Sequence, residues 1–279
     1  MNPVTGFLRR MSESKTALFG FGVLLFFAIM AVSVQFLPIP NPNSLNFQAF
    51  LPPSLAHPFG TDYLGRDVFS IVLWGSRAAL AVGIISAGIS AVIGIVVGAV
   101  AAYYGGWVDD VISRVVDVFL MIPVFFLILI VVAIFGGNIF YTMAIIGVTI
   151  WPSNARLMRA QILSLKEMTF VKALRSYGVG GFSILFRHLL PNGVAPVITN
   201  TMLQMGAAVL IEAGLSFLGL GDPRVVDWGR TIYLGEPYVA LAWWISTIPG
   251  AFLALLVLGL NLLGDGLNQV FRPRMRGSK

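Results

Sequence analysis

The sequence predicts an all-α membrane protein with six transmembrane helices. Hydrophobic residues make up 57% of its 279 residues and charged residues only 11%, whereas soluble domains carry roughly 25% charged residues. The mean hydropathy is +0.88. A helix needs about 20 apolar residues to cross a bilayer, and six stretches come near that length: 17–37, 78–103, 115–135, 139–153, 194–218 and 240–263. Together they define a six-span transmembrane domain over residues 17–265.

The first stretch, 17–37, follows Arg9, Arg10 and Lys15. Its apolar run of about 20 residues is longer than the roughly 7–15 residues of a signal-peptide core, and no small-residue cleavage pattern follows it. We therefore expect it to stay in the protein as a membrane anchor. Residues 1–16 then form a cytoplasmic N-terminal segment.

The distribution of Lys and Arg predicts the orientation. With the N-terminus inside, fourteen of the 18 basic residues lie inside, and the four outside are Arg66, Arg77, Arg224 and Arg230. Cytoplasmic loops of membrane proteins carry this excess. We expect both termini, the central loop 156–192 and the tail 266–279 to be cytoplasmic, and the segment 38–77 to be extracytoplasmic.

The extracytoplasmic segment ends in a stretch with turn and cap residues. Gly60 and Gly65 permit tight turns, and Asp62, Arg66 and Asp67 can pair locally or cap the helix that leads into the second span. We favour this local role. The alternative is contact of Asp62, Arg66 and Asp67 with a binding protein or a substrate.

The second and third spans carry packing and charge signals. Gly94, Gly98 and Ala102 form a small-residue face in the second span, which lets another helix approach closely. We expect internal packing there, with a subunit interface as the alternative. Pro123 should kink the third span, and the short fourth span should end near Pro152.

Two sets of carboxylates lie at or inside the spans. Asp110, Arg114 and Asp117 share one helix face at the cytoplasmic end of the third span, and we interpret them as an interfacial charge cluster rather than a proton relay. Glu212 lies well inside the fifth span, where a carboxylate is costly unless it faces protein or water.

The central loop is the longest internal segment that cannot sit in lipid. Its helical period places Phe170, Ala173, Leu174 and Tyr177 on one face. Gly178 should end this helix. A second short helix, 182–190, should be closed by Pro191, which cannot continue a hydrogen-bonded turn. The two helices predict a compact knob, residues 168–190.

The knob carries a family resemblance. Lys172-Ala173-Leu174, Gly178, Ile184 and Leu190-Pro191-Asn192 resemble the ATPase-docking loop of ABC importer permeases, and the stretch 186–192 resembles the dipeptide, oligopeptide and nickel permease branch. Lys172 replaces the family's Glu, and Leu174 its second Ala. Three further blocks resemble that branch, in the right order: 60–70, 214–221 with Trp228-Gly229, and 261–265 with Pro273-Arg274, where Arg272 replaces the usual Asp.

The resemblance implies a C-type subunit with the type I ABC importer permease fold, in the bacterial inner membrane. It implies a heterodimer with a homologous permease, one or two ABC ATPase subunits, and an extracytoplasmic solute-binding protein. The implied ATPase-docking residues are Phe170, Lys172, Ala173, Leu174, Arg175, Tyr177, Gly178 and Pro191. Dipeptides, oligopeptides, nickel chelates, opines and glutathione all remain open as solutes.

Several other functions find no support in the residues. The sequence contains no G-x4-G-K-[ST] loop to cradle ATP phosphates, no cysteine, and only two histidines far apart, His57 and His188. We therefore expect no catalytic site, no cofactor and no metal site. The basic residues lie at span ends, which argues against nucleic acid as a partner. The alternatives are an ion-coupled transporter or channel that uses Glu212 or Asp117, and a membrane scaffold or assembly factor.

Overall fold

The computed structural model describes residues 11–271, and the regular elements in this range are helices. The long helices are α2 (Lys15–Ser33), α3 (Val68–Tyr104), α4 (Gly106–Met121), α5 (Val124–Phe135), α6 (Ile139–Lys166), α10 (Ala195–Phe217) and α12 (Trp244–Phe271). The short ones are η1 (Val34–Phe36), α7 (Thr169–Ser176), α8 (Gly181–Ser183), the π-helix η2 (Ile184–Leu189), α9 (Leu190–Gly193), α11 (Trp228–Gly235) and η3 (Glu236–Tyr238).

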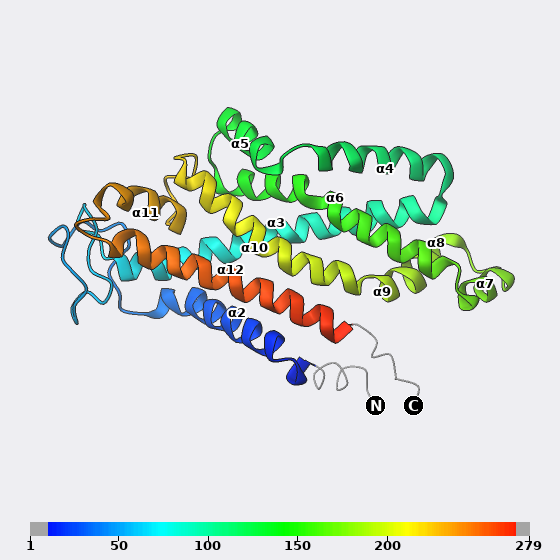
Figure 1. The fold of residues 1–279 in the computed structure, drawn as a ribbon, viewed down its shortest axis with the longest axis horizontal. Coiled ribbons are helices and arrows are strands. Elements are labelled where there is room, and N and C mark those ends of the chain that lie inside the picture. The colour runs from blue at the N-terminus through cyan, green and yellow to red at the C-terminus, as the bar shows by residue number, and fades with distance from the viewer. Residues whose placement is uncertain (1–10, 272–279) are drawn as a thin grey trace.

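The long helices run side by side along the longest axis of the molecule (Figure 1). At one end, which we call the α7 end, lie α7 and α8. At the other, the α11 end, lie α11 and the segment between α2 and α3. α2 and the α4–α5 pair occupy opposite edges of the bundle (Figure 1). The first turn of α2 meets the last turns of α12, where the Ser14 hydroxyl donates to Gln269 Oε1 at 3.3 Å.

The all-α membrane fold expected from the sequence is confirmed. Residues Lys15–Phe36, α3 and α12 are each long and apolar enough to cross a membrane, and the number rises to five if α4–α5 and the pair 181–193 with α10 each count as one span. The remaining expected span falls on α6. Asn154 and Arg156 lower its hydropathy, so it does not meet the same criterion on its own.

The expected kink in the third span is a complete break. α4 and α5 meet at an angle of 82°, because the helix stops at Met121 and restarts after Pro123, which has no N–H to continue the hydrogen-bond ladder. The helix of the expected fourth span does not end near Pro152. α6 continues through Pro152 to Lys166, and the Gln204 amide of α10 donates to the nearby Ile150 carbonyl at 2.8 Å.

Two further boundaries differ from the expectation. Pro191 does not close the second short helix, because it lies inside a helical run that continues from Gly181 to Gly193. The chain instead bends by 59° at Val194, between α9 and α10. α3 begins at Val68, ten residues before the expected second span, so the helix that we expected to lead into that span is continuous with it.

Close backbone contact joins α3 to α6. A Cβ at Gly94 would meet Asn154, and a Cβ at Gly98 would meet the backbone of Ala155. Ala102 is fully buried one turn further on. The small-residue face of the second span therefore packs inside the chain, as we expected, and no larger residue fits there.

Candidate functional site

The knob lies at the α7 end between the last residue of α6 and the first of α10 (Figure 1). α7 spans eight residues, Thr169–Ser176, and Gly178 follows with a φ of +76°, a left-handed conformation that glycine adopts without strain. The Gly178 N–H bonds the Arg175 carbonyl at 3.0 Å and the Val179 N–H bonds the Leu174 carbonyl at 3.1 Å. This is a Schellman motif, and it confirms that Gly178 ends the helix.

The knob is attached to three long helices through a buried apolar cluster. Val171 of α7 is fully buried, as are Ile184, Leu185 and Leu189 of η2. They pack with Ala99 and Ala102 of α3, Met158 and Ile162 of α6, and Val197 of α10. In addition, the Lys166 ammonium donates to the Ala102 carbonyl at 2.9 Å. Because interiors packed in this way deform little, a force on the knob reaches α3, α6 and α10 together.

The predicted docking residues fall into two groups. The first group is exposed. Phe170, Lys172, Ala173 and Arg175 lie on α7, Tyr177 and Gly178 follow it directly, and Pro191 lies in α9. Leu174 differs, because it is only partly exposed and packs against the buried cluster beside Val171. We had expected Leu174 on the outward face. Its side chain instead helps to fix α7 to the bundle.

The structure adds two exposed apolar residues to the knob. Met168 precedes α7 and Phe182 lies in α8, and both are largely exposed. The Phe182 ring lies 4.4 Å from the ring of Phe186. Sequence reasoning missed both because they lie outside the periodic stretch of α7. The Lys172 ammonium lies 3.9 Å from the Glu167 carboxylate, and both groups are well exposed, so this pair contributes little stability.

A polar network that the sequence analysis missed joins α3, α6 and α10. Gln204 Oε1 accepts from the Ser90 hydroxyl at 2.8 Å and from Asn154 Nδ2 at 2.7 Å, and Gln204 Nε2 donates to the Ser153 hydroxyl at 2.8 Å. The Asn154 Oδ1 atom accepts from Asn200 at 2.8 Å. The sequence did contain a signal for this network, namely amide side chains inside apolar spans. The network fixes the register of these helices at the depth of the spans.

Glu212 has a partner and little space around it. It is 7% exposed, and the Ser216 hydroxyl donates to its Oε1 atom at 2.8 Å. With Asp227 and Trp228 it lines a cavity of only about 10 Å³. This cavity leaves no room for a hydrated ion beside the Glu212 carboxylate.

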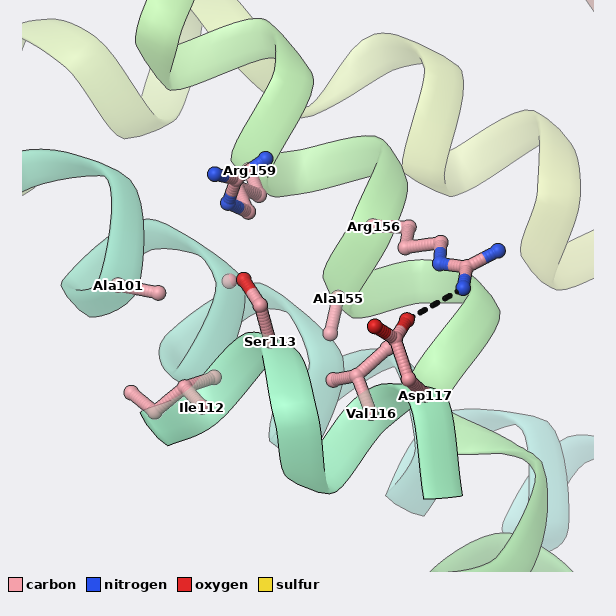
Figure 2. A pocket seen from close by; sticks show the side chains of 9 residues that line it. Ala101, Ile112, Ser113, Val116, Asp117, Ala155, Arg156 and Arg159 are labelled. Atoms are coloured by element: carbon pink, nitrogen blue, oxygen red, sulfur yellow. Dashed lines mark hydrogen bonds and ion pairs between the residues drawn. The ribbon is translucent and has the colours of Figure 1, made fainter. Parts of the chain in front are cut away.

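Asp117 also has a partner, on a different helix from the one we expected. It lies in the wall of a cavity of about 370 Å³ between α3, α4 and α6 (Figure 2). Its Oδ1 atom lies 2.6 Å from an Arg156 guanidinium nitrogen. Asp109, which our expected cluster did not include, forms two bonds of 2.6 Å with Arg159. The charges therefore join α4 to α6 rather than forming a cluster on α4 alone.

Asp62 and Arg66 bind each other, and Asp67 binds the start of α3. Asp62 accepts from the Arg66 side chain at 2.6 Å and from the Arg66 N–H at 2.8 Å, while Asp67 accepts from the Phe69 N–H at 3.1 Å and caps α3. Burial raises the pKa of the Asp67 carboxyl. These bonds confirm the local role, whereas contact with another protein remains a prediction.

Comparison with known proteins agrees with this geometry. The family model "Binding-protein-dependent transport system inner membrane component" matches residues 94–277, and "N-terminal TM domain of oligopeptide transport permease C" matches residues 2–53.

Three relatives cover nearly the whole chain. The dipeptide transport system permease protein DppC of Bacillus subtilis is 36% identical over 96% of this chain and 85% of its own length. DppC of Alkalihalophilus pseudofirmus is 34% identical, over 96% and 89%. The glutathione transport system permease protein GsiD of Pectobacterium atrosepticum is 35% identical, over 98% and 92%. This chain therefore belongs to the family of binding-protein-dependent transport system inner membrane components, as a C-type permease subunit of an ABC importer.

Proposed function

We propose that this chain and a homologous second permease subunit form the translocation path of an importer for peptides or a related small solute. The chain is a transmembrane subunit and not an enzyme, because ATP hydrolysis in this family belongs to separate subunits. An extracytoplasmic binding protein would deliver the solute. The names of the relatives, which refer to dipeptide and glutathione transport, support this solute class.

The observation that carries the proposal is the attachment of the knob. Its buried side packs on α3, α6 and α10, and its outer side presents Phe170 and Tyr177 with the basic residues Lys172 and Arg175. We infer that the outer side contacts one or two ATPase subunits. ATP binding would draw the ATPase pair together and move the knob, and the packed cluster would pass that motion to the spans as a rigid body. Hydrolysis would reset them.

Co-isolation of the complex tests the proposal. The tagged chain, extracted in mild detergent from its native membrane, should bring with it an ABC ATPase and a second permease of similar size. Recovery of the chain without any ATPase, under conditions in which it stays folded, would overturn the proposal. The same result would favour the ion-coupled transporter or the scaffold.

We predict that both termini and the knob are cytoplasmic. The basic residues support this orientation, as does the contact of the first turn of α2 with the end of α12. Alkaline phosphatase is active only outside the cytoplasm. A fusion after Asn43 should therefore be active and a fusion after Lys279 inactive, and activity of the second fusion would contradict the six-span topology.

We predict that Glu212→Gln leaves ATP-driven uptake largely intact. Glutamine keeps the size of the side chain and an oxygen for the Ser216 hydroxyl, and ATP rather than an ion gradient supplies the work. Uptake and complex assembly should be measured together for the variant and for the unchanged protein. Loss of uptake with normal assembly, restored by a change of external pH, would favour an ion-coupled transporter.

A further inference from the structure

The break between α4 and α5 lies beside the middle of the bundle. The Phe119 ring, at the end of α4, lies 5.7 Å from the Trp151 ring, near the middle of the 28-residue α6. On the other side of the break, Ile128 and Val132 of α5 are fully buried against α3 and α6. Figure 1 shows α4 ending partway along α6 and α5 turning out of line with α4. The break therefore lies at the depth of the apolar spans.

A break at this depth exposes backbone groups that lipid cannot satisfy. The last carbonyls of one helix and the first N–H groups of the next have no partner within their own helices, and Pro123 has no N–H to offer. Among the described residues, α5 has no side-chain cap. Met121 is 80% exposed beside the break. Irregular backbone at membrane depth is tolerated only where protein or a water-filled cavity covers it.

The second bent pair offers a contrast. The bend at Val194 lies at the α7 end, directly after the exposed Pro191 and Asn192. The Asn192 side chain donates there to the His188 carbonyl at 2.6 Å. Water and side chains can satisfy that bend, so it needs no partner. At the α4–α5 break, by contrast, no side chain of the described residues caps the start of α5.

The exposed side of α4 and α5 is an apolar stripe. Its members recur every three or four residues, so that they share one face on each helix, and all are exposed: Val115, Val118, Ile122, Phe126, Ile130 and Ile134. Phe126 is 63% exposed, and Phe135, which follows Ile134 and extends the stripe, is 71% exposed. An aromatic side chain offers roughly 150–250 Å², so these two alone expose about 270 Å². The aliphatic members bring the stripe to the order of the roughly 800 Å² per partner of a standard interface.

We infer that the α4–α5 stripe, with the break at Ile122–Pro123, is the surface on which the homologous second permease subunit docks. This inference rests on the proposed function, because it names the surface for a partner proposed there. A chain of the same family supplies apolar helices that match the stripe. Side chains or backbone of that chain bond the open groups at the break, which lipid chains cannot do.

Photo-cross-linking tests the surface directly. The chain contains no cysteine, so Met121→Cys and Ile134→Cys each introduce one reactive thiol. Ile29→Cys is the matched control, because Ile29 is 58% exposed and apolar but lies on α2, at the opposite edge of the bundle (Figure 1). Each variant is labelled with benzophenone maleimide in the assembled transporter, illuminated in the membrane, and probed for a tag on the second permease.

We expect a cross-linked product with the second permease from Met121→Cys and Ile134→Cys, and none from Ile29→Cys. Equal products at Ile29, or products with lipid only at Met121 and Ile134, would overturn the inference. Rapid labelling of Met121→Cys by a charged, membrane-impermeant maleimide would also overturn it, because the break would then line a water-filled path. If one of these results is obtained while the complex still isolates intact, only the docking surface is wrong and the proposed function is unaffected. Isolation of the chain with no second permease would defeat both.

Discussion

Replacement of Tyr177 by alanine should weaken binding of the ATPase subunit by at least about 2 kcal/mol, or roughly 30-fold in Kd. Tyr177 is 86% exposed at the end of α7, and the Schellman bonds at Gly178 hold the backbone there in one conformation. A large aromatic side chain on a fixed backbone loses little conformational freedom on binding. Phe170→Ala, on the same face at the start of α7, should act in the same direction.

Two variants on the same helix serve as controls. Ser176→Ala removes only a hydroxyl that donates to the Lys172 carbonyl, and Lys172→Ala removes an exposed charge, which at an interface rim costs about 1 kcal/mol or less. Co-purification of the ATPase and ATP-driven uptake are measured for each variant, and both should fall in Tyr177→Ala and Phe170→Ala but change little in the two controls. Undiminished recovery and uptake in both Tyr177→Ala and Phe170→Ala would remove the docking assignment from α7.

Leu174→Ala should be interpreted differently. The partly buried Leu174 packs against the cluster that contains Val171 and Leu185, so its truncation loosens the attachment of the knob to the spans. We expect weaker coupling between ATP hydrolysis and uptake with less loss of ATPase recovery than in Tyr177→Ala. The ratio of ATP hydrolysed to solute taken up measures this directly.

Replacement of Gly98 by leucine should destabilise the protein by about 3 kcal/mol, the upper end of the usual cost of overpacking a core. A Cβ at Gly98 would lie 3.0 Å from the carbonyl carbon and Cα of Ala155. These are backbone atoms, which no change of rotamer can move, so α3 and α6 would have to separate. Their separation would also strain the Asn154–Gln204 hydrogen bonds nearby.

Gly88→Leu is the matched control on the same helix. A Cβ at Gly88 meets nothing within 4 Å, and leucine is preferred to glycine in a helix by up to about 1 kcal/mol. This variant should be neutral or slightly stabilised. Unfolding in detergent, followed by circular dichroism for both variants, checks the difference. Equal midpoints would show that α3 and α6 are not in close contact.

Local sequence signals predicted the parts of the structure that local chemistry determines. Gly178 ends α7 because its conformation favours glycine, and Gly94 and Gly98 mark a close helix contact because any side chain would fill it. The positions of the apolar spans could be predicted from the length of each apolar run. Each of these features depends on a few neighbouring residues.

The missed features depend on partners far along the chain. α7 has two apolar faces, one with Phe170 and Tyr177 and one with Val171 and Leu174, and periodicity alone does not tell which of them meets the bundle. α6 continues through Pro152, although proline often ends a helix, and the helix is held there by residues far along the chain: the Gln204 amide donates to the Ile150 carbonyl, 54 positions away. The apolar run through Met121 and Val124 hid the 82° break. Hydropathy shows that a segment is apolar, but not in which direction its helix axis runs.

Uptake into proteoliposomes tests the central claim most directly. The purified complex, containing this chain, its second permease and its ATPase, is reconstituted without any ion gradient, and a labelled dipeptide is supplied with the binding protein. The account predicts uptake that requires both ATP and the binding protein, and that is lost in Tyr177→Ala while Glu212→Gln retains it. Uptake driven by an imposed proton or sodium gradient without ATP, and abolished by Glu212→Gln, would contradict the account.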